Sequence, residues 1–235
     1  MKTAFFQSFE DSSDREETPF RLSMVQAELR KNSLSGYLVP RSDVHQGEYV
    51  AACDERLSWL TGFTGSAGIC IVGKDRAGIF VDGRYSIQAK KQTKSPFEVI
   101  QWDKKSVFQW IKKNIVKGKI GFDPWLHTAD AIRQFENLMN QKGGKLVPLN
   151  LNPVDEIWTD QPSIPLSPIV PHDIIYSGKS SIDKKKMVCE TLKQNDEDAV
   201  VLSSPESIAW LLNIRGSDVP RTPLPLSFVI LSVDF

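Results

Sequence analysis

Polar residues of the kind that perform chemistry are concentrated between residues 43 and 85 of this chain. His45 and Glu48 have the H-x-x-E spacing, which could place an imidazole and a carboxylate on one face of a helix as metal ligands. A helical metal site of this kind also needs a second histidine at a suitable distance, and the sequence has none there. The spacing alone is a weak metal signal, and we expect no metal site at these residues.

A second group of potential ligands consists of Asp123, His127 and Asp130. The same residues suit the beginning of a helix, because Thr128 can cap it and Asp130 can interact with the positive end of its dipole. We therefore expect a structural role for this group and no metal ion bound by it.

A glycine-rich turn at residues 61–68 reads TGFTGSAG and invites two enzymatic interpretations. A nucleophile elbow needs G-x-S-x-G, but the residue two positions before Ser66 is Thr64. A phosphate-binding loop leads from a strand into a helix, whereas this turn leads into the apolar run at residues 69–72. We expect a tight turn under neighbouring elements, where side chains would clash, and no catalysis by Ser66.

The turn formed by residues 82–85 reads DGRY. Asp82 can cap the helix that follows, which is a sufficient structural role for it. Arg84 and Tyr85 would then lie at the start of that helix, where a guanidinium can bind a carboxylate of a ligand or partner through two hydrogen bonds. The sequence therefore makes Arg84 and Tyr85 candidates for a functional contact.

The composition excludes several classes of function. In 235 residues, Lys plus Arg and Asp plus Glu number 29 each, so no net charge attracts the chain to nucleic acid or to an anionic membrane. No apolar run approaches the roughly 20 residues of a membrane span, and no signal peptide is visible. Three cysteines without a zinc spacing favour reduced thiols and a cytoplasmic location.

Alternating helix and strand patterns predict an α/β fold with a mixed sheet covered by helices on both faces. Strands are expected at residues 36–40, 69–72, 78–81, 97–101, 119–122 and 145–149. Five helices are expected in this part of the chain. Three begin at the capping residues Thr18, Ser106 and Thr128, and the last of these ends at Gly143. The other two are expected at residues 48–60 and from Asp82 to about residue 93.

A proline-rich stretch then divides the chain. Five prolines fall between residues 153 and 171, where they oppose both helix and strand. A second alternation follows, with helices at 182–194 and 205–212 and strands at 199–202 and 226–233. We expect a loose segment at 1–17, a first domain at 18–152, a linker at 153–173 and an incomplete second α/β domain at 174–235, which exposes apolar sheet surface that favours association.

The order of motifs resembles the N-terminal region of aminopeptidase P, the Xaa-Pro aminopeptidase branch of the creatinase and prolidase metallopeptidase family. The resemblance covers nearly the whole chain, through HQGEY, CDERLSWLTGFTGSAG, VDGRYSIQA, GFDPWLHT, NPVDEIWTDQPSIP, YSGKSSIDKKKM and SIAWLLNIRGSDVP. It implies a creatinase N-terminal-like first domain and a truncated second domain of similar type.

The resemblance also implies a function. A full-length family member is a cytosolic hydrolase that removes the N-terminal residue from peptides with proline at position two. It uses two divalent metal ions, usually manganese, bound by a later domain that has no matching segment here. This chain is therefore expected to contain no catalytic residue, no metal ligand and no cofactor.

By the same resemblance, the N-terminal domain contributes to a homodimer and shapes the entrance to the active site, with His45, Arg84 and Tyr85 as candidates for that entrance. Two readings of the chain remain open. It is a fragment of a working aminopeptidase, or it is a stand-alone, non-catalytic dimerisation module made from a truncated gene. Neither reading assigns it binding to nucleic acid or to a membrane.

Overall fold

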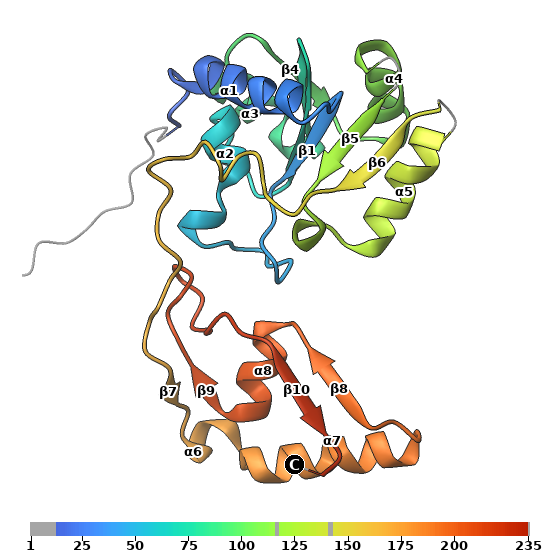
Figure 1. Ribbon diagram of the computed structural model, residues 1–235. Helices are drawn as coiled ribbons and strands as arrows, with labels where there is room; N and C mark the ends of the chain where they lie inside the picture. Colours follow the sequence, from blue (N-terminus) through green and yellow to red (C-terminus); the bar gives the residue numbers. More distant parts are fainter. Residues whose placement is uncertain (1–12, 116–117, 141–142, 235) are drawn as a thin grey trace, which may run out of the picture. The chain divides into compact units, whose positions relative to one another are not determined.

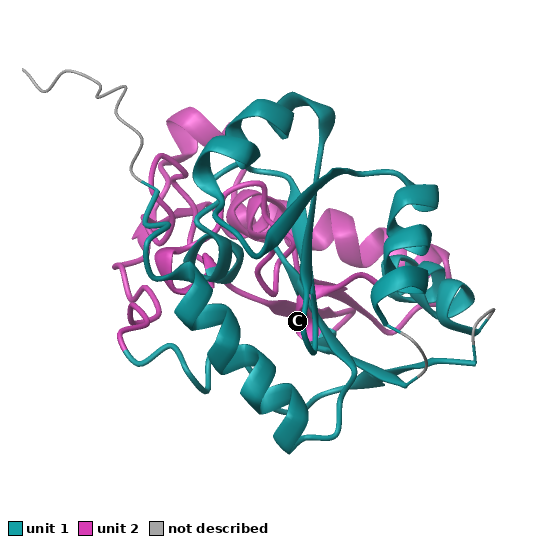
Figure 2. Cartoon of the chain, turned by 90° about the horizontal axis from the view of Figure 1, so that it is seen from above, with its two compact units in different colours: residues 1–41, 56–124, 129–159 teal, residues 42–55, 125–128, 160–235 magenta. Residues whose placement is uncertain are grey.

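The structure is a computed structural model that describes residues 13–115, 118–140 and 143–234 (Figure 1). The chain forms two compact units (Figure 2). Unit 1 comprises residues 1–41, 56–124 and 129–159, and unit 2 comprises residues 42–55, 125–128 and 160–235. Residues 1–12 of the segment expected to be loose lie outside the described residues.

Unit 1 is built on a six-stranded mixed sheet with the order β4-β3-β2-β1-β5-β6. The central strand β1 pairs antiparallel with β2 and parallel with β5, β2 pairs antiparallel with β3, and the outer pairs β3-β4 and β5-β6 are parallel. All six predicted strands are confirmed, as β1 Gly36–Pro40, β2 Gly68–Gly73, β3 Ala77–Val81, β4 Phe97–Gln101, β5 Lys119–Phe122 and β6 Lys145–Pro148.

Helices cover both faces of this sheet, as the sequence predicts (Figure 1). Helices α1 (Thr18–Lys31), α2 (Arg56–Thr61) and α3 (Ser86–Gln92) pack on one face, in a core cluster that includes Cys70 of β2. Helices α4 (Lys104–Asn114) and α5 (Ala129–Asn140) pack on the other face, with Ile71 of β2. Consecutive residues of β2 thus point into two separate cores, which explains why the strand is apolar throughout.

The helix predicted at residues 48–60 is wrong in extent. The structure has a 3₁₀ turn, η1 (Ala52–Asp54), and then the short helix α2. A competing local structure precedes them, because the Asp43 carboxylate accepts hydrogen bonds from the backbone N–H groups of His45 and Gly47. Such side-chain to backbone bonds offer the chain an alternative to a helix.

Two predicted helix caps are also wrong. Glu17 occupies the N-cap position of α1, and the Thr18 hydroxyl donates a hydrogen bond back to the carbonyl of Arg15. Helix α4 is capped by Asp103, whose carboxylate accepts from the Ser106 N–H at 2.8 Å while the Ser106 hydroxyl accepts from the Asp103 N–H. Ser106 is thus the third helical residue of a capping box. Asp82 does cap a turn, the 3₁₀ segment η2 (Gly83–Tyr85) that precedes α3.

Unit 2 contains the second alternation. The predicted helices and the first predicted strand are confirmed as α7 (Ser181–Gln194), α8 (Pro205–Leu212) and β8 (Ala199–Leu202). The last strand, β10 (Val229–Ser232), is shorter than the predicted 226–233. The short elements β7 (Val170–Pro171), α6 (Ile174–Ser177) and β9 (Ile214–Arg215) are additional to the prediction.

Strands β8 and β10 form a two-stranded antiparallel sheet that exposes apolar side chains. Val201 and Ile230 are directly opposed across the two strands and are 70% and 75% exposed. The opposite face carries Val200 and Leu231, which pack against α7 and α8. The expected exposure of apolar sheet surface in this part of the chain is confirmed.

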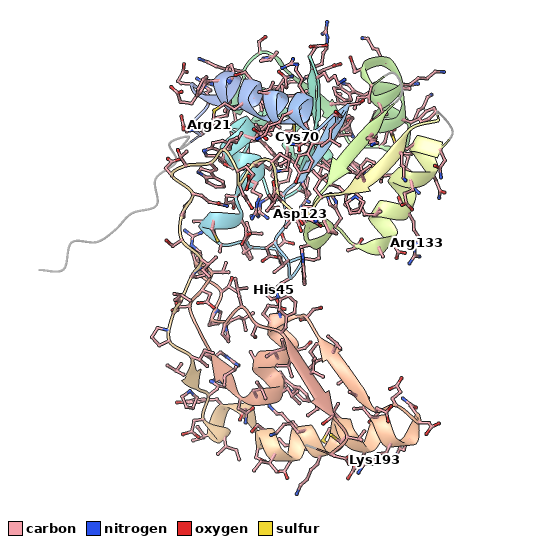
Figure 3. All side chains as sticks on the ribbon, viewed as in Figure 1. Arg21, His45, Cys70, Asp123, Arg133 and Lys193 are labelled. Atoms are coloured by element: carbon pink, nitrogen blue, oxygen red, sulfur yellow. The ribbon has the colours of Figure 1, made fainter. Side chains whose placement is uncertain are left out.

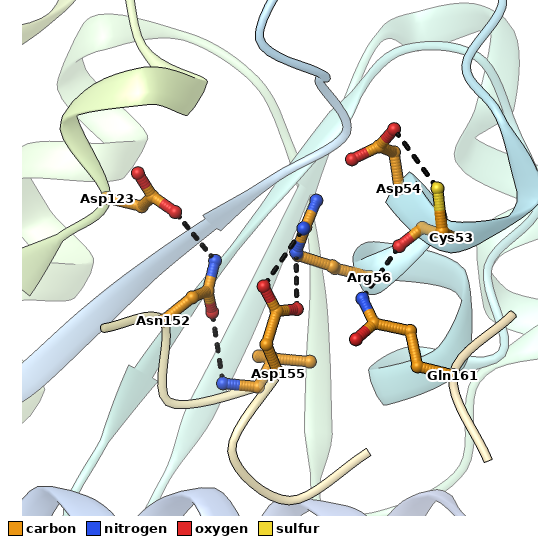
Figure 4. Close-up of polar contacts among 8 residues, drawn as sticks. Cys53, Asp54, Arg56, Asp123, Asn152, Asp155 and Gln161 are labelled. Carbon is orange, nitrogen blue, oxygen red and sulfur yellow. Dashed lines mark hydrogen bonds and ion pairs between the residues drawn. The ribbon is translucent and has the colours of Figure 1, made fainter. Parts of the chain in front are cut away.

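An ion pair fastens the segment after β6 to helix α2 within unit 1 (Figure 4). The Arg56 guanidinium donates from Nε to Asp155 Oδ1 at 2.7 Å and from Nη2 to Asp155 Oδ2 at 3.0 Å. Asn152 in the same segment donates to the Asp123 carboxylate at 3.1 Å, just beyond β5. The indole of Trp158 stacks on that of Trp59, with ring centroids 5.2 Å apart.

The Tyr37 hydroxyl is buried near these charges and has no hydrogen-bond partner. Burial, and secondarily the carboxylates of Asp123 and Asp155, raise the pKa of Tyr37 well above its ordinary value, while the Arg56 guanidinium opposes them. Tyr37 therefore stays neutral.

Three buried cysteines, Cys53, Cys70 and Cys189, are all free thiols, in keeping with the expectation of reduced cysteines. Figure 3 labels Cys70, on strand β2. No helix in the described ranges is long and apolar enough to cross a membrane.

We expect Asp155→Asn to lower the free energy of unfolding by about 1.5–3 kcal/mol, because the largely buried Arg56 guanidinium would lose a charged hydrogen-bond acceptor. Asp130→Asn is a matched control, since Asp130 pairs with Arg133 where both side chains are mostly exposed. That variant should change stability by less than about 0.5 kcal/mol. Urea unfolding of both variants measures the difference, and equal losses would contradict a structural role for the Arg56–Asp155 pair.

We expect the stability of the chain to fall with rising pH because of Cys70. Burial raises the pKa of the Cys70 thiol in the native state, so the unfolded chain loses this proton first as the pH rises. The free energy of unfolding should then decline from about pH 8.5, by as much as about 1.4 kcal/mol per pH unit, and Cys70 should contribute no slope below that pH. Cys70→Ala should show a shallower decline in urea unfolding between pH 8.5 and 10. An unchanged slope in the variant would disprove this assignment.

Candidate functional site

Arg84 and Tyr85 lie together at the start of α3 in unit 1. The Tyr85 hydroxyl is 2.7 Å from the Ser66 hydroxyl in the glycine-rich turn, and its ring meets Phe63 edge to face with centroids 5.6 Å apart. The Arg84 guanidinium lies over the Tyr85 ring, 5.4 Å from its centroid. The two candidates at the DGRY turn are therefore neighbours in space as well as in sequence.

The glycine-rich turn is held against α3 by close contact. A Cβ atom at Gly65 would lie 2.2 Å from the Phe63 ring and 2.9 Å from the Tyr85 ring, so only glycine fits there. Gly62 has a φ of +79°, a conformation that other residues rarely adopt. The Gln92 side chain accepts from the Thr64 N–H at 3.0 Å and donates to the Thr64 hydroxyl at 2.8 Å. The turn thus supports Tyr85 and has the structural character that the sequence predicts.

Arg84 presents its charge to solvent. Its side chain is 70% exposed, and its Nε donates to Asp82 Oδ1 at 2.8 Å. The Asp82 carboxylate also accepts from the Arg84 N–H, and this bond, with the guanidinium beside it, lowers the pKa of Asp82. Asp82 therefore orients Arg84, whose guanidinium lies largely in solvent.

His45, the third candidate, is labelled in Figure 3 and belongs to unit 2. Its ring stacks on Phe228 with centroids 4.4 Å apart, and its Nδ1 is 3.1 Å from the carbonyl oxygen of Ser203. Because a carbonyl only accepts, Nδ1 carries the hydrogen of this bond. The imidazole is thus oriented by residues far along the chain, a feature that the H-x-x-E spacing does not reveal.

A small cavity in unit 2 adds residues that the sequence analysis did not single out. Its volume is about 40 Å³, and Asp43 and Glu206 line it together with His45 and Glu48. Asp43 is 1% exposed, and its Oδ2 has no hydrogen-bond partner. The sequence did carry a signal for the turn, because an aspartate such as Asp43 commonly accepts hydrogen bonds from N–H groups a few residues later, here those of His45 and Gly47. No sequence signal connects Asp43 to Glu206.

The candidate metal ligands do not form a metal centre in the described part of the chain, where no group of three or more His, Cys, Asp and Glu side chains is arranged to hold an ion. Asp123 instead accepts a hydrogen bond from Asn152. Asp130 pairs with Arg133 on the surface of α5. Two of the candidate ligands, Asp123 and Asp130, are thus engaged by partners within the protein.

Comparisons with known proteins identify the family. Residues 21–156 match the family described as Creatinase/Prolidase N-terminal domain, and residues 160–234 match a second family of the same description. Aminopeptidase P2 of Arabidopsis thaliana is 38% identical over 207 residues, which are 86% of this chain and 29% of that protein. A probable Xaa-Pro aminopeptidase P of Laccaria bicolor is 34% identical, over 92% of this chain and 35% of its own length. The chain thus spans about a third of the length of these relatives.

A solved structure agrees with the sequence matches. The crystal structure of X-prolyl aminopeptidase from Caenorhabditis elegans, described as a cytosolic enzyme with a di-nuclear active site, has a TM-score of 0.83 at 33% identity. It covers 92% of this chain, which in turn covers 37% of that protein. The chain therefore belongs to the creatinase/prolidase N-terminal domain family, and it corresponds to the N-terminal region of proteins named aminopeptidase P or Xaa-Pro aminopeptidase.

Proposed function

We propose that this chain is the non-catalytic N-terminal part of a cytosolic Xaa-Pro aminopeptidase, which removes the residue that precedes proline at the amino end of a peptide. The similarity to the C. elegans enzyme carries the proposal, because it extends over 92% of this chain in both sequence and fold. The catalytic metal ions, two divalent cations such as manganese, would be bound by the part of the enzyme that this chain does not span.

The role proposed for this chain is to form a homodimer and to shape the entrance to the active site. The exposed guanidinium of Arg84 supports that role, since a peptide substrate carries a carboxylate that an arginine can bind through two hydrogen bonds. Tyr85 would position it through the contact between its ring and the guanidinium. His45 is a separate candidate for the entrance, and its ring is oriented within unit 2 by Phe228.

The proposed function can be tested by replacing the corresponding region of the C. elegans enzyme with this chain. The chimera should cleave Arg-Pro-Pro in the presence of Mn²⁺ and sediment as a dimer, whereas the 235-residue chain alone should not cleave the peptide. The remainder of the C. elegans enzyme without an N-terminal region is the control. Cleavage by the isolated chain would contradict the proposal, and an inactive but folded chimera would favour a stand-alone module.

In that chimera we expect Arg84→Ala to raise the KM for Arg-Pro-Pro about fivefold. The reason is that the substrate would lose one ion pair, and a partly solvated ion pair contributes only a small binding energy. Arg133→Ala is a closely matched control, because Arg133 is 69% exposed, against 70% for Arg84, and also pairs with a nearby aspartate. The control should leave KM and kcat unchanged. Steady-state kinetics decides, and equal effects of the two substitutions would remove Arg84 from the entrance.

A further inference from the structure

The cavity in unit 2 has the properties of a binding site for a small cation. Its charged lining consists of the carboxylates of Asp43, Glu48 and Glu206, and none of its lining residues is a lysine or an arginine. Asp43 is the buried carboxylate among them, whereas Glu48 and Glu206 are exposed and Glu206 accepts a hydrogen bond from the Ser204 hydroxyl at 2.8 Å. A positive group beside Asp43 lowers the cost of burying its negative charge. The acidic lining of the cavity therefore favours a positively charged ligand.

Asp43 supplies an independent observation that points to a ligand. Its Oδ1 is fully engaged, since it accepts from the N–H of His45 at 3.0 Å and from the N–H of Gly47 at 2.9 Å. Its Oδ2 is buried and has no partner, although the side chain lines the cavity. Buried carboxylates are normally paired or hydrogen-bonded, so an unpartnered oxygen beside a cavity marks the place of a missing donor.

The size of the cavity limits the ligand. One water needs about 10–15 Å³ of such space. A cavity of about 40 Å³ therefore has room for a group of two or three heavy atoms. A bare metal ion is disfavoured, because Glu48 and Glu206 line the cavity without joining Asp43 in a group that could hold an ion. A primary ammonium fits better, since it brings three N–H donors that bind carboxylates at hydrogen-bond distance.

We propose that the cavity lined by Asp43, Glu48 and Glu206 binds a primary ammonium group, with Asp43 Oδ2 as its principal acceptor. Two sources carry this chemistry, the free α-amino end of a peptide and the side chain of a lysine. Glu206, in the first turn of α8, adds negative charge from a different segment of unit 2. His45, a candidate for the proposed entrance, also lines this cavity, but binding of an ammonium group does not depend on the proposed function.

The test is binding of methylammonium to the 235-residue chain, followed by the thermal midpoint and by the chemical shift of the Gly47 amide. Tetramethylammonium at the same ionic strength is the control, because it has the charge but lacks N–H donors and is too large. Methylammonium should raise the midpoint and shift the Gly47 signal, and tetramethylammonium should do neither. Glycinamide and Nα-acetyl-lysinamide then distinguish an α-amino group from a lysine side chain.

Asp43→Asn should weaken methylammonium binding about tenfold or more, because an amide replaces the charged acceptor while Oδ1 still accepts the two backbone bonds. Asp160→Asn, at an exposed position of unit 2, is the matched control and should bind like the unmodified chain. Glu206→Gln leaves the Asp43 turn intact and should weaken binding severalfold, which keeps the test decisive if Asp43→Asn does not fold.

Three results would overturn the proposal. The first is binding by K⁺ or Na⁺ with the same dependence on Asp43, which would make the site an alkali-metal site. The second is no response to any cation, which would leave an ordered water as the partner of Asp43. The third is equal binding by the Asp43→Asn and Asp160→Asn variants.

Discussion

Burial of strands β1, β2 and β3 on both faces is the constraint on which the structure of unit 1 depends. Every residue of β1 and β3 is buried, and so is every residue of β2 after Gly68. A sheet with two apolar faces is stable in water only when helices cover both. The glycine-rich turn leads from α2 into β2 and is crowded against Tyr85, so it positions the DGRY residues.

The segment that follows the sheet is held by polar contacts. Asn152 and Asp155 bind partners that are 29 and 99 residues earlier in the chain, and Trp158 adds a stacked aromatic pair. Because the Arg56–Asp155 contact is bidentate, it fixes the direction as well as the position of this segment. The motif NPVDEIW thus combines two polar contacts and one apolar contact within seven residues.

The sequence is sufficient to predict much of the fold and little of the polar geometry. Strands such as β3 are visible as short apolar runs between turn residues, and their burial follows from the same pattern. The start of α4 shows the limit, because Asp103 and Ser106 are both good capping residues and only the backbone decides which one is the cap. The pairing of His45 with Phe228, or of Arg56 with Asp155, joins residues that no local pattern connects. Arg84 and Tyr85 could be named as candidates because they are adjacent in sequence, whereas Asp43 and Glu206 could not be joined without the structure.

The opposed pair Val201 and Ile230 has a consequence for how the protein behaves in solution. Each strand of this sheet pairs on one side only within the described residues, and the exposed cross-strand pair adds an apolar surface beside the free edges. Self-association through such a surface brings two chains together, so the fraction of associated chains rises with protein concentration. The fold of each unit is the same at every concentration. Dilute samples and concentrated samples of the same preparation would then differ in assembly although their secondary structure is identical.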